Sequence, residues 1–126
     1  HIDSNITINS NVVNHKGLAV ANYTEYANNI VNAGSSFTVS TGTNVSRYTL
    51  NASHCEITLP AGQPIQPASM KTIILYLKQD GTGGRTVDFN ASEPEVVSGA
   101  NKVSIYTFMK FHGDTNWYCS QSFIEN

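Results

Sequence analysis

The chain has 126 residues, a length that suits one domain with a buried core. Charged residues make up 13% of it, the net charge is −2 and no two Lys or Arg residues are adjacent, which excludes the basic surface that binds nucleic acid. There is no apolar run of about 18 residues, and no basic segment followed by an apolar one opens the chain, so we expect neither a membrane-spanning helix nor a signal peptide. Because the first residue is His1, we also expect a piece of a longer protein.

Residues 1–35 are predicted to form a connector that precedes the main domain. Asn22 can cap a helix, and Glu25 follows three residues later, which is the capping-box arrangement. Gly34 is a stop signal at the other end. The apolar positions between them recur at helical spacing: Tyr23, Tyr26, Ala27, Ile30 and Val31. We therefore expect a short helix near Tyr23–Val31, or otherwise an extended connector.

From residue 36 onward the sequence predicts β-strands separated by turns. Runs rich in β-branched and aromatic residues alternate with clusters of Gly, Pro, Asn and Thr. The predicted strands are Phe37–Ser40, Arg47–Leu50, Cys55–Leu59, Thr72–Lys78, Thr86–Phe89, Glu95–Val97, Val103–Phe111 and Trp117–Phe123. Strands at these intervals predict an all-β head domain over residues 36–126, with the fold of an antiparallel β-sandwich of the jelly-roll type.

Two of these strands carry large apolar side chains on both faces. Ile73–Leu77 and Ile105–Phe111 lack the alternation of an antiparallel strand that has one face in water. A second sheet can cover one face, and either the N-terminal helix or another copy of the chain must cover the other. We expect the following residues at a contact between copies: Ile74, Tyr76, Tyr106 and Phe108.

Two segments that contain glycine turns are the most informative about the class of protein to which the chain is similar. In KQDGTGGRTVDF, residues 78–89, Asp80-Gly81 and Gly83-Gly84 supply the positive-φ positions of a tight hairpin. In KVSIYTFMKFHGDTNWYCS, residues 102–120, a long strand, a turn and a return strand form a second hairpin. In this order and spacing, the two segments resemble a C-terminal module of tailed-phage structural proteins such as fibres, tail spikes and head decorations. Upstream, NITINSNVVNHKGLA resembles the phrase that precedes the tip domains of phage fibres.

The resemblance implies a virion protein at a fibre tip or on the capsid surface, and the family it resembles is commonly trimeric. Our leading interpretation is the non-enzymatic head domain of a tail fibre or spike, which attaches to a glycan or receptor on the host surface. One alternative is a decoration protein that stabilises the capsid or tail. The others are a stand-alone carbohydrate-binding lectin and a hydrolase or lyase that acts on glycans.

No constellation of catalytic residues stands out in the sequence. Glu93 and Glu95 share strand spacing, which would place two carboxylates on one side as in a glycosidase pair, but a solvated loop explains Glu93-Pro94-Glu95 better. The four histidines do not recur at the spacing of metal ligands on one element. The glycine run 81–84 lacks the Lys-Ser/Thr ending of a phosphate-binding loop, and no GxSxG motif is present. We expect no enzymatic activity, no metal and no cofactor.

Aromatic residues in polar surroundings are the candidates for ligand binding: Tyr23, Tyr26, Tyr48 and Trp117. Exposed rings can stack on sugars, whereas the alternative is a ring that packs in the core while its polar group makes a hydrogen bond. Cys55 and Cys119 either pair as a disulfide or remain buried thiols that behave as small apolar side chains.

Overall fold

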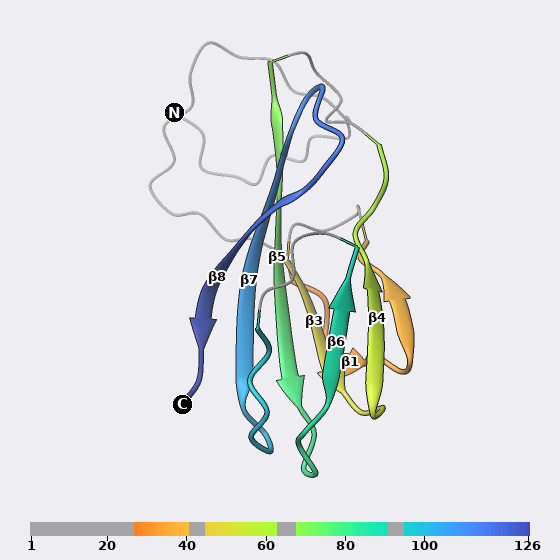
Figure 1. The fold of residues 1–126 in the computed structure, drawn as a ribbon, viewed down its shortest axis with the longest axis vertical. Helices are drawn as coiled ribbons and strands as arrows, with labels where there is room; N and C mark the ends of the chain where they lie inside the picture. Colours follow the sequence, from red (N-terminus) through yellow and green to blue (C-terminus); the bar gives the residue numbers. More distant parts are fainter. Residues whose placement is uncertain (1–26, 41–44, 63–67, 91–94) are drawn as a thin grey trace, which may run out of the picture.

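The computed structural model of the protein describes residues 27–40, 45–62, 68–90 and 95–126 (Figure 1). These residues form eight strands and no helix, so they offer no helical segment able to cross a membrane. The strands are β1 (Val31–Asn32), β2 (Ser36–Thr38), β3 (Val45–Leu50), β4 (His54–Thr58), β5 (Met70–Gln79), β6 (Thr86–Phe89), β7 (Val103–Phe111) and β8 (Tyr118–Ile124). The prediction of an all-β fold is confirmed.

The strands form two sheets that pack face to face (Figure 1). The large sheet has the order β1-β3-β5-β7-β8, and the small sheet has the order β2-β4-β6. Every pairing among β1 to β6 is parallel, and only the pairings β5–β7 and β7–β8 are antiparallel. The predicted antiparallel sandwich is therefore wrong for the first six strands.

From β1 to β6 the chain alternates between the large and the small sheet. Each pair of strands stacks in register on the preceding pair, so that Val31 lies beside Tyr48 in the large sheet and Ser36 lies beside Glu56 in the small one. The second coil is longer than the first, because the connection at residues 59–69 is longer than that at residues 39–44. Stacked coils of this kind are a short parallel β-solenoid, which β7 and β8 complete as an antiparallel extension.

The hydrophobic core lies between the two sheets. Successive side chains of a strand point to opposite faces, so β5 buries Ile73, Leu75 and Leu77 on its inner side. Tyr106 and Phe108 of β7 are fully buried beside them, and the ring centroid of each lies 5.5 Å from that of Phe89 in the small sheet. The buried apolar residues as a set are Ala33, Val39, Leu50, Cys55, Ile57, Leu59, Ile73, Leu75, Leu77, Phe89, Tyr106, Phe108 and Trp117. Both cysteines are free thiols.

The second predicted hairpin is confirmed, but the first is not. The strands β7 and β8 pair directly across a turn in which Gly113 has a φ of +94°. In the first segment, Gly83 and Gly84 have φ values of +73° and +70°, as expected, whereas Gly81 does not have a positive φ. However, β5 and β6 belong to different sheets, so the turn between them is a β-arch.

The predicted helix near Tyr23–Val31 is wrong over the residues described. Ala27 forms a parallel bridge with Val45, and β1 pairs with β3. Asn28 holds the intervening chain against β3, since its side-chain oxygen accepts the backbone N–H of Arg47 at 2.6 Å and its amide donates to the Arg47 carbonyl at 3.3 Å. The residues before Ala27 lie outside the described ranges. Sheet pairing therefore outweighs helical spacing in this segment.

Residues 95–97, predicted as a strand, lie outside both sheets. Their carbonyl groups accept side-chain hydrogen bonds instead: the Tyr106 hydroxyl donates to Glu95, and Gln79 Nε2 donates to Val97 at 2.7 Å. Burial raises the pKa of the Tyr106 hydroxyl to about 12, so it remains a neutral donor. The large sheet begins at β1, before residue 36, while the division of the chain into residues 1–35 and 36–126 stays a prediction.

Candidate functional site

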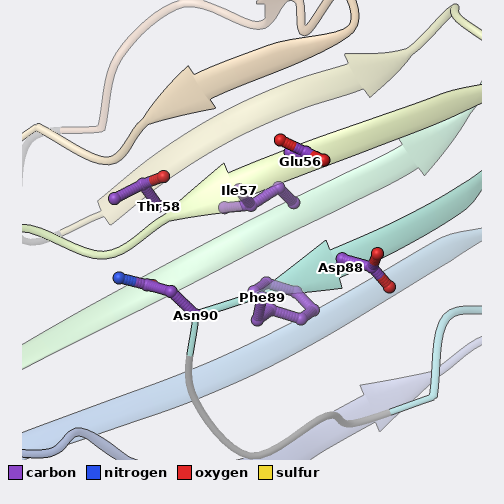
Figure 2. A pocket seen from close by; sticks show the side chains of 6 residues that line it. All are labelled: Glu56, Ile57, Thr58, Asp88, Phe89 and Asn90. Carbon is purple, nitrogen blue, oxygen red and sulfur yellow. The ribbon is translucent and has the colours of Figure 1, made fainter.

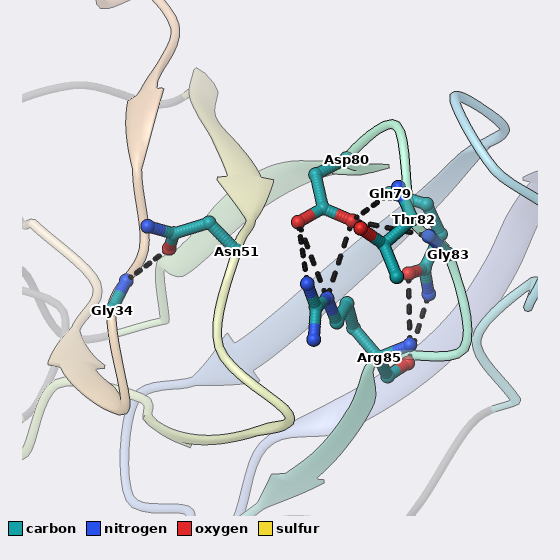
Figure 3. Close-up of polar contacts among 7 residues, drawn as sticks. All are labelled: Gly34, Asn51, Gln79, Asp80, Thr82, Gly83 and Arg85. Atoms are coloured by element: carbon teal, nitrogen blue, oxygen red, sulfur yellow. Dashed lines mark hydrogen bonds and ion pairs between the residues drawn. The ribbon is translucent and has the colours of Figure 1, made fainter.

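The β5–β6 arch, residues 80–85, is closed by an ion pair (Figure 3). Arg85 Nη2 donates to Asp80 Oδ2 at 2.8 Å, and Arg85 Nε lies 3.2 Å from both carboxylate oxygens. Asp80 Oδ1 also accepts the backbone N–H groups of Thr82 and Gly83, each at 3.1 Å. The bond from Arg85, and after it those from the backbone, lower the pKa of the Asp80 carboxyl, although desolvation opposes them. Both charged groups are thus occupied in holding the turn.

Gln79 fixes the other side of the arch from within the core. Its Nε2 donates to the carbonyls of Arg85 at 2.8 Å and Val97 at 2.7 Å, and its Oε1 accepts the Arg85 N–H at 3.0 Å. Next to it, a Cβ at Gly83 would lie 2.7 Å from the backbone nitrogen of Ala100. The arch and the loop before β7 are therefore packed backbone against backbone, and the role of the glycine motif is structural.

The outer face of the small sheet has a different character, because every side chain that the strands direct outward is polar. The inner positions are Phe37, Cys55, Ile57, Val87 and Phe89, which contact the core. The outer positions are Ser36 and Thr38 on β2, His54, Glu56 and Thr58 on β4, and Thr86 and Asp88 on β6. This strict alternation makes the outer face of the small sheet polar along its strands.

On this face, His54 connects β4 to β6. Its Nδ1 lies 2.7 Å from the Thr86 hydroxyl, and its Nε2 lies 3.2 Å from Asp88 Oδ2. The side chains of His54 and Asp88 remain 42% and 60% exposed, so this contact is open to solvent. It orders one side of the surface without closing it.

Beside this contact, a shallow hollow of about 200 Å³ lies between β4 and β6 (Figure 2). Glu56 and Asp88 are opposite each other in register, and Thr58 and Asn90 come two residues further along the two chain segments. We call these four residues the polar groove; the inward-pointing Ile57 and Phe89 complete its lining. Within the described ranges, no cluster of three His, Cys, Asp or Glu side chains could hold a metal ion.

Two of the aromatic residues predicted to bind a ligand are used inside the fold. Tyr48 stacks on Phe37 between the sheets, with ring centroids 3.8 Å apart. Trp117 is 9% exposed and its ring N–H donates to the Pro60 carbonyl at 3.0 Å, while the Lys110 ammonium lies 5.8 Å from the ring. Trp117 is therefore not free to stack on a sugar, and that prediction is corrected.

The other two predicted ligand-binding residues, Tyr23 and Tyr26, lie outside the described residues.

The four residues expected at a contact between copies divide into two pairs. Tyr106 and Phe108 are fully buried in the core of their own chain, so they cannot meet another copy and their assignment to a subunit contact was wrong. Ile74 and Tyr76 point to the outer face of the large sheet and are partly exposed, and their role stays a prediction.

Comparison with known protein families gives one match. Residues 36–116 match the model of a family described as "Putative phage tail fibre C-terminal domain". The chain belongs to this family. No curated protein and no solved structure matches it.

In this tail fibre domain, the matched residues include the whole small sheet and the strands β3, β5 and β7. The β5–β6 arch, β7 and most of the turn after it lie within the match, whereas β8 follows it. Family membership places the domain in the tail of the virion.

Sequence reasoning did not find the polar groove of the tail fibre domain. Its local signal was the alternation Glu56-Ile57-Thr58 and Asp88-Phe89-Asn90, in which polar residues flank an apolar one. That pattern identifies an exposed strand face. It does not show that two segments more than thirty positions apart lie side by side, which required the parallel pairing of β4 with β6.

Proposed function

We propose that this tail fibre domain is a non-enzymatic attachment module that binds a glycan or receptor on the host surface. The observation that carries the proposal is the outer face of the small sheet, whose polar side chains are exposed and contribute nothing to the hydrophobic core. The hollow on this face is lined by two carboxylates, a hydroxyl and an amide, groups that can bind a polar ligand.

The mechanism is multivalent binding by a rigid surface. The parallel sheet fixes the backbone positions that carry the polar groups, so less conformational entropy is lost on binding than a flexible loop would lose. Single contacts of this kind are weak. Several copies on one particle convert them into high avidity, since each bound copy raises the effective concentration of the next.

We also propose that the domain works as a homotrimer, in which copies meet through the outer face of the large sheet. Ile74 and Tyr76 on β5 lie beside Thr107 and Ile105 on β7. At the rim of the same face, large apolar side chains are 45–54% exposed: Met70, Phe111, Tyr118 and Phe123. Exposed apolar residues gathered on one sheet face favour association, and closed cyclic symmetry would leave no open chain of contacts.

The test of attachment is competition. The purified domain is added to host cells before the phage that carries the fibre, and free phage are counted after a short incubation. We expect the domain to slow adsorption in a dose-dependent manner, while heat-denatured domain has no effect. Binding of the labelled domain to phage particles instead of cells would support the alternative of a decoration protein, and the absence of competition would contradict attachment.

A further inference from the structure

The polar groove has hydrogen-bonding capacity that the fold does not use. Within the described part of the chain, the Glu56 carboxylate and the Thr58 hydroxyl have no hydrogen-bond partner. Asn90 is held in place through its side-chain oxygen, which accepts the Leu59 N–H at 2.7 Å. Its amide N–H groups therefore remain as donors at the edge of the hollow. Figure 2 shows Asn90 among the residues that line it.

The side chains of the polar groove suit a ligand that both donates and accepts hydrogen bonds. Two carboxylates accept hydrogen bonds, the amide of Asn90 donates them, and the Thr58 hydroxyl does both. Neighbouring hydroxyl groups of a sugar offer donors and acceptors at a similar close spacing. The register fixes Glu56 opposite Asp88, so that one sugar ring could reach both strands at once.

The charge of the surface limits the ligand further. The polar groove carries the carboxylates of Glu56 and Asp88, and none of the described Lys or Arg residues lies on β2, β4 or β6. The nearest one in sequence, Arg85, is already paired with Asp80. A ligand with carboxylate or phosphate groups would therefore meet the unpaired Glu56 carboxylate, while His54 lies 3.2 Å from Asp88.

We propose that the polar groove binds a neutral, polyhydroxylated sugar unit of a surface glycan and disfavours acidic sugars. This inference rests on the attachment function proposed above and specifies its ligand class. The hollow is shallow and no exposed aromatic ring lines it, because Phe89 is 7% exposed and packs in the core. Binding by a single domain is accordingly weak, and avidity supplies the rest.

The test uses oligosaccharides released from the host cell surface and divided by anion exchange into a neutral and an acidic fraction. Each fraction is titrated into isotope-labelled domain, and amide chemical shifts are followed by NMR. We expect the neutral fraction to shift the amides of Glu56–Thr58 and Asp88–Asn90, while the acidic fraction at equal sugar concentration leaves them in place. Shifts confined to another surface, or equal shifts with both fractions, would overturn the inference.

Two variants locate the effect within the polar groove. Glu56→Gln and Thr58→Val each remove one hydrogen-bonding function at an exposed position, and we expect each to weaken binding of the neutral fraction about threefold to tenfold, which corresponds to one hydrogen bond. Thr82→Val, which removes an exposed hydroxyl in the β5–β6 arch, is the matched control, and it should bind like the wild type. Unchanged binding in both groove variants would contradict the inference.

The adsorption assay separates this inference from the broader function. If the wild-type domain competes for adsorption and the two variants compete equally well, attachment stands and the groove assignment fails. If the wild-type domain does not compete at all, the attachment function itself fails.

Discussion

Asp80 and Arg85 close the β5–β6 arch through a two-point ion pair, in which Arg85 Nη2 lies 2.8 Å from Asp80 Oδ2 and Nε lies 3.2 Å from both oxygens. Four residues lie between the partners, and over this stretch the chain passes from the large sheet to the small one. The pair therefore stabilises the turn through which each sheet is connected to the other in this coil of the solenoid.

This pair predicts a pH-dependent contribution to stability. The pKa of Asp80 is lower in the folded state than in the unfolded chain, chiefly because of Arg85. The ionised Asp80 carboxylate therefore stabilises the fold fully above the ordinary pKa of Asp, about 3.9. This stabilisation is lost as the pH falls through the pKa of Asp80 in the folded state. We expect the difference in Tm between wild type and Asp80→Asn to be largest near neutral pH and to shrink in acid. Thermal unfolding followed by circular dichroism measures it, and a constant difference would refute the assignment.

The glycines of the arch should differ in their tolerance of a methyl group. Gly83→Ala places a Cβ 2.7 Å from the backbone nitrogen of Ala100 at a φ of +73°, so we expect a loss of about 3 kcal/mol or more. Gly84→Ala has open space but a φ of +70°, so strain alone should cost about 1–2 kcal/mol. Gly81→Ala is the control, with neither feature. Urea denaturation gives the three values, and equal losses would show that the contact with Ala100 is unimportant.

Gln79 is a buried polar residue whose loss should be costly. Gln79→Leu removes three hydrogen bonds and leaves backbone groups of Arg85 and Val97 without these partners, so we expect destabilisation by about 3 kcal/mol. Lys78→Gln, one residue earlier and on the outer face, should change stability by less than about 0.5 kcal/mol. The midpoint of urea unfolding reports both, and a stable Gln79→Leu variant would mean that water replaces the amide.

The proposed trimer is tested by comparing two positions on β7 that face opposite ways. Ile105→Asp, on the outer face, should dissociate the assembly while the β-structure remains. Phe108→Asp, in the core, should unfold the domain because it buries a charge without a partner. Light scattering gives the mass of each species, and circular dichroism gives its structure. A monomeric wild-type domain at micromolar concentration would rule out the trimer.

The residues of β2 to β8 could largely be read from the sequence because the signals are local, whereas β1 overlaps the predicted helix. Val103–Phe111 and Thr86–Phe89 have the predicted bounds, and Gly83, Gly84 and Gly113 have the positive φ that their turns require. Backbone sterics act within a few residues, so a sequence carries this information directly.

The partners of the strands were decided only by the tertiary structure. A strand that alternates between apolar and polar residues looks the same whether its turn leads to a hairpin or to an arch, so Lys78–Phe89 did not reveal that β5 and β6 join different sheets. The polar groove depends on the same choice. Glu56 and Asp88 become neighbours because the coil length sets the register of β4 against β6, and that register follows from backbone hydrogen bonds between segments far apart in the chain.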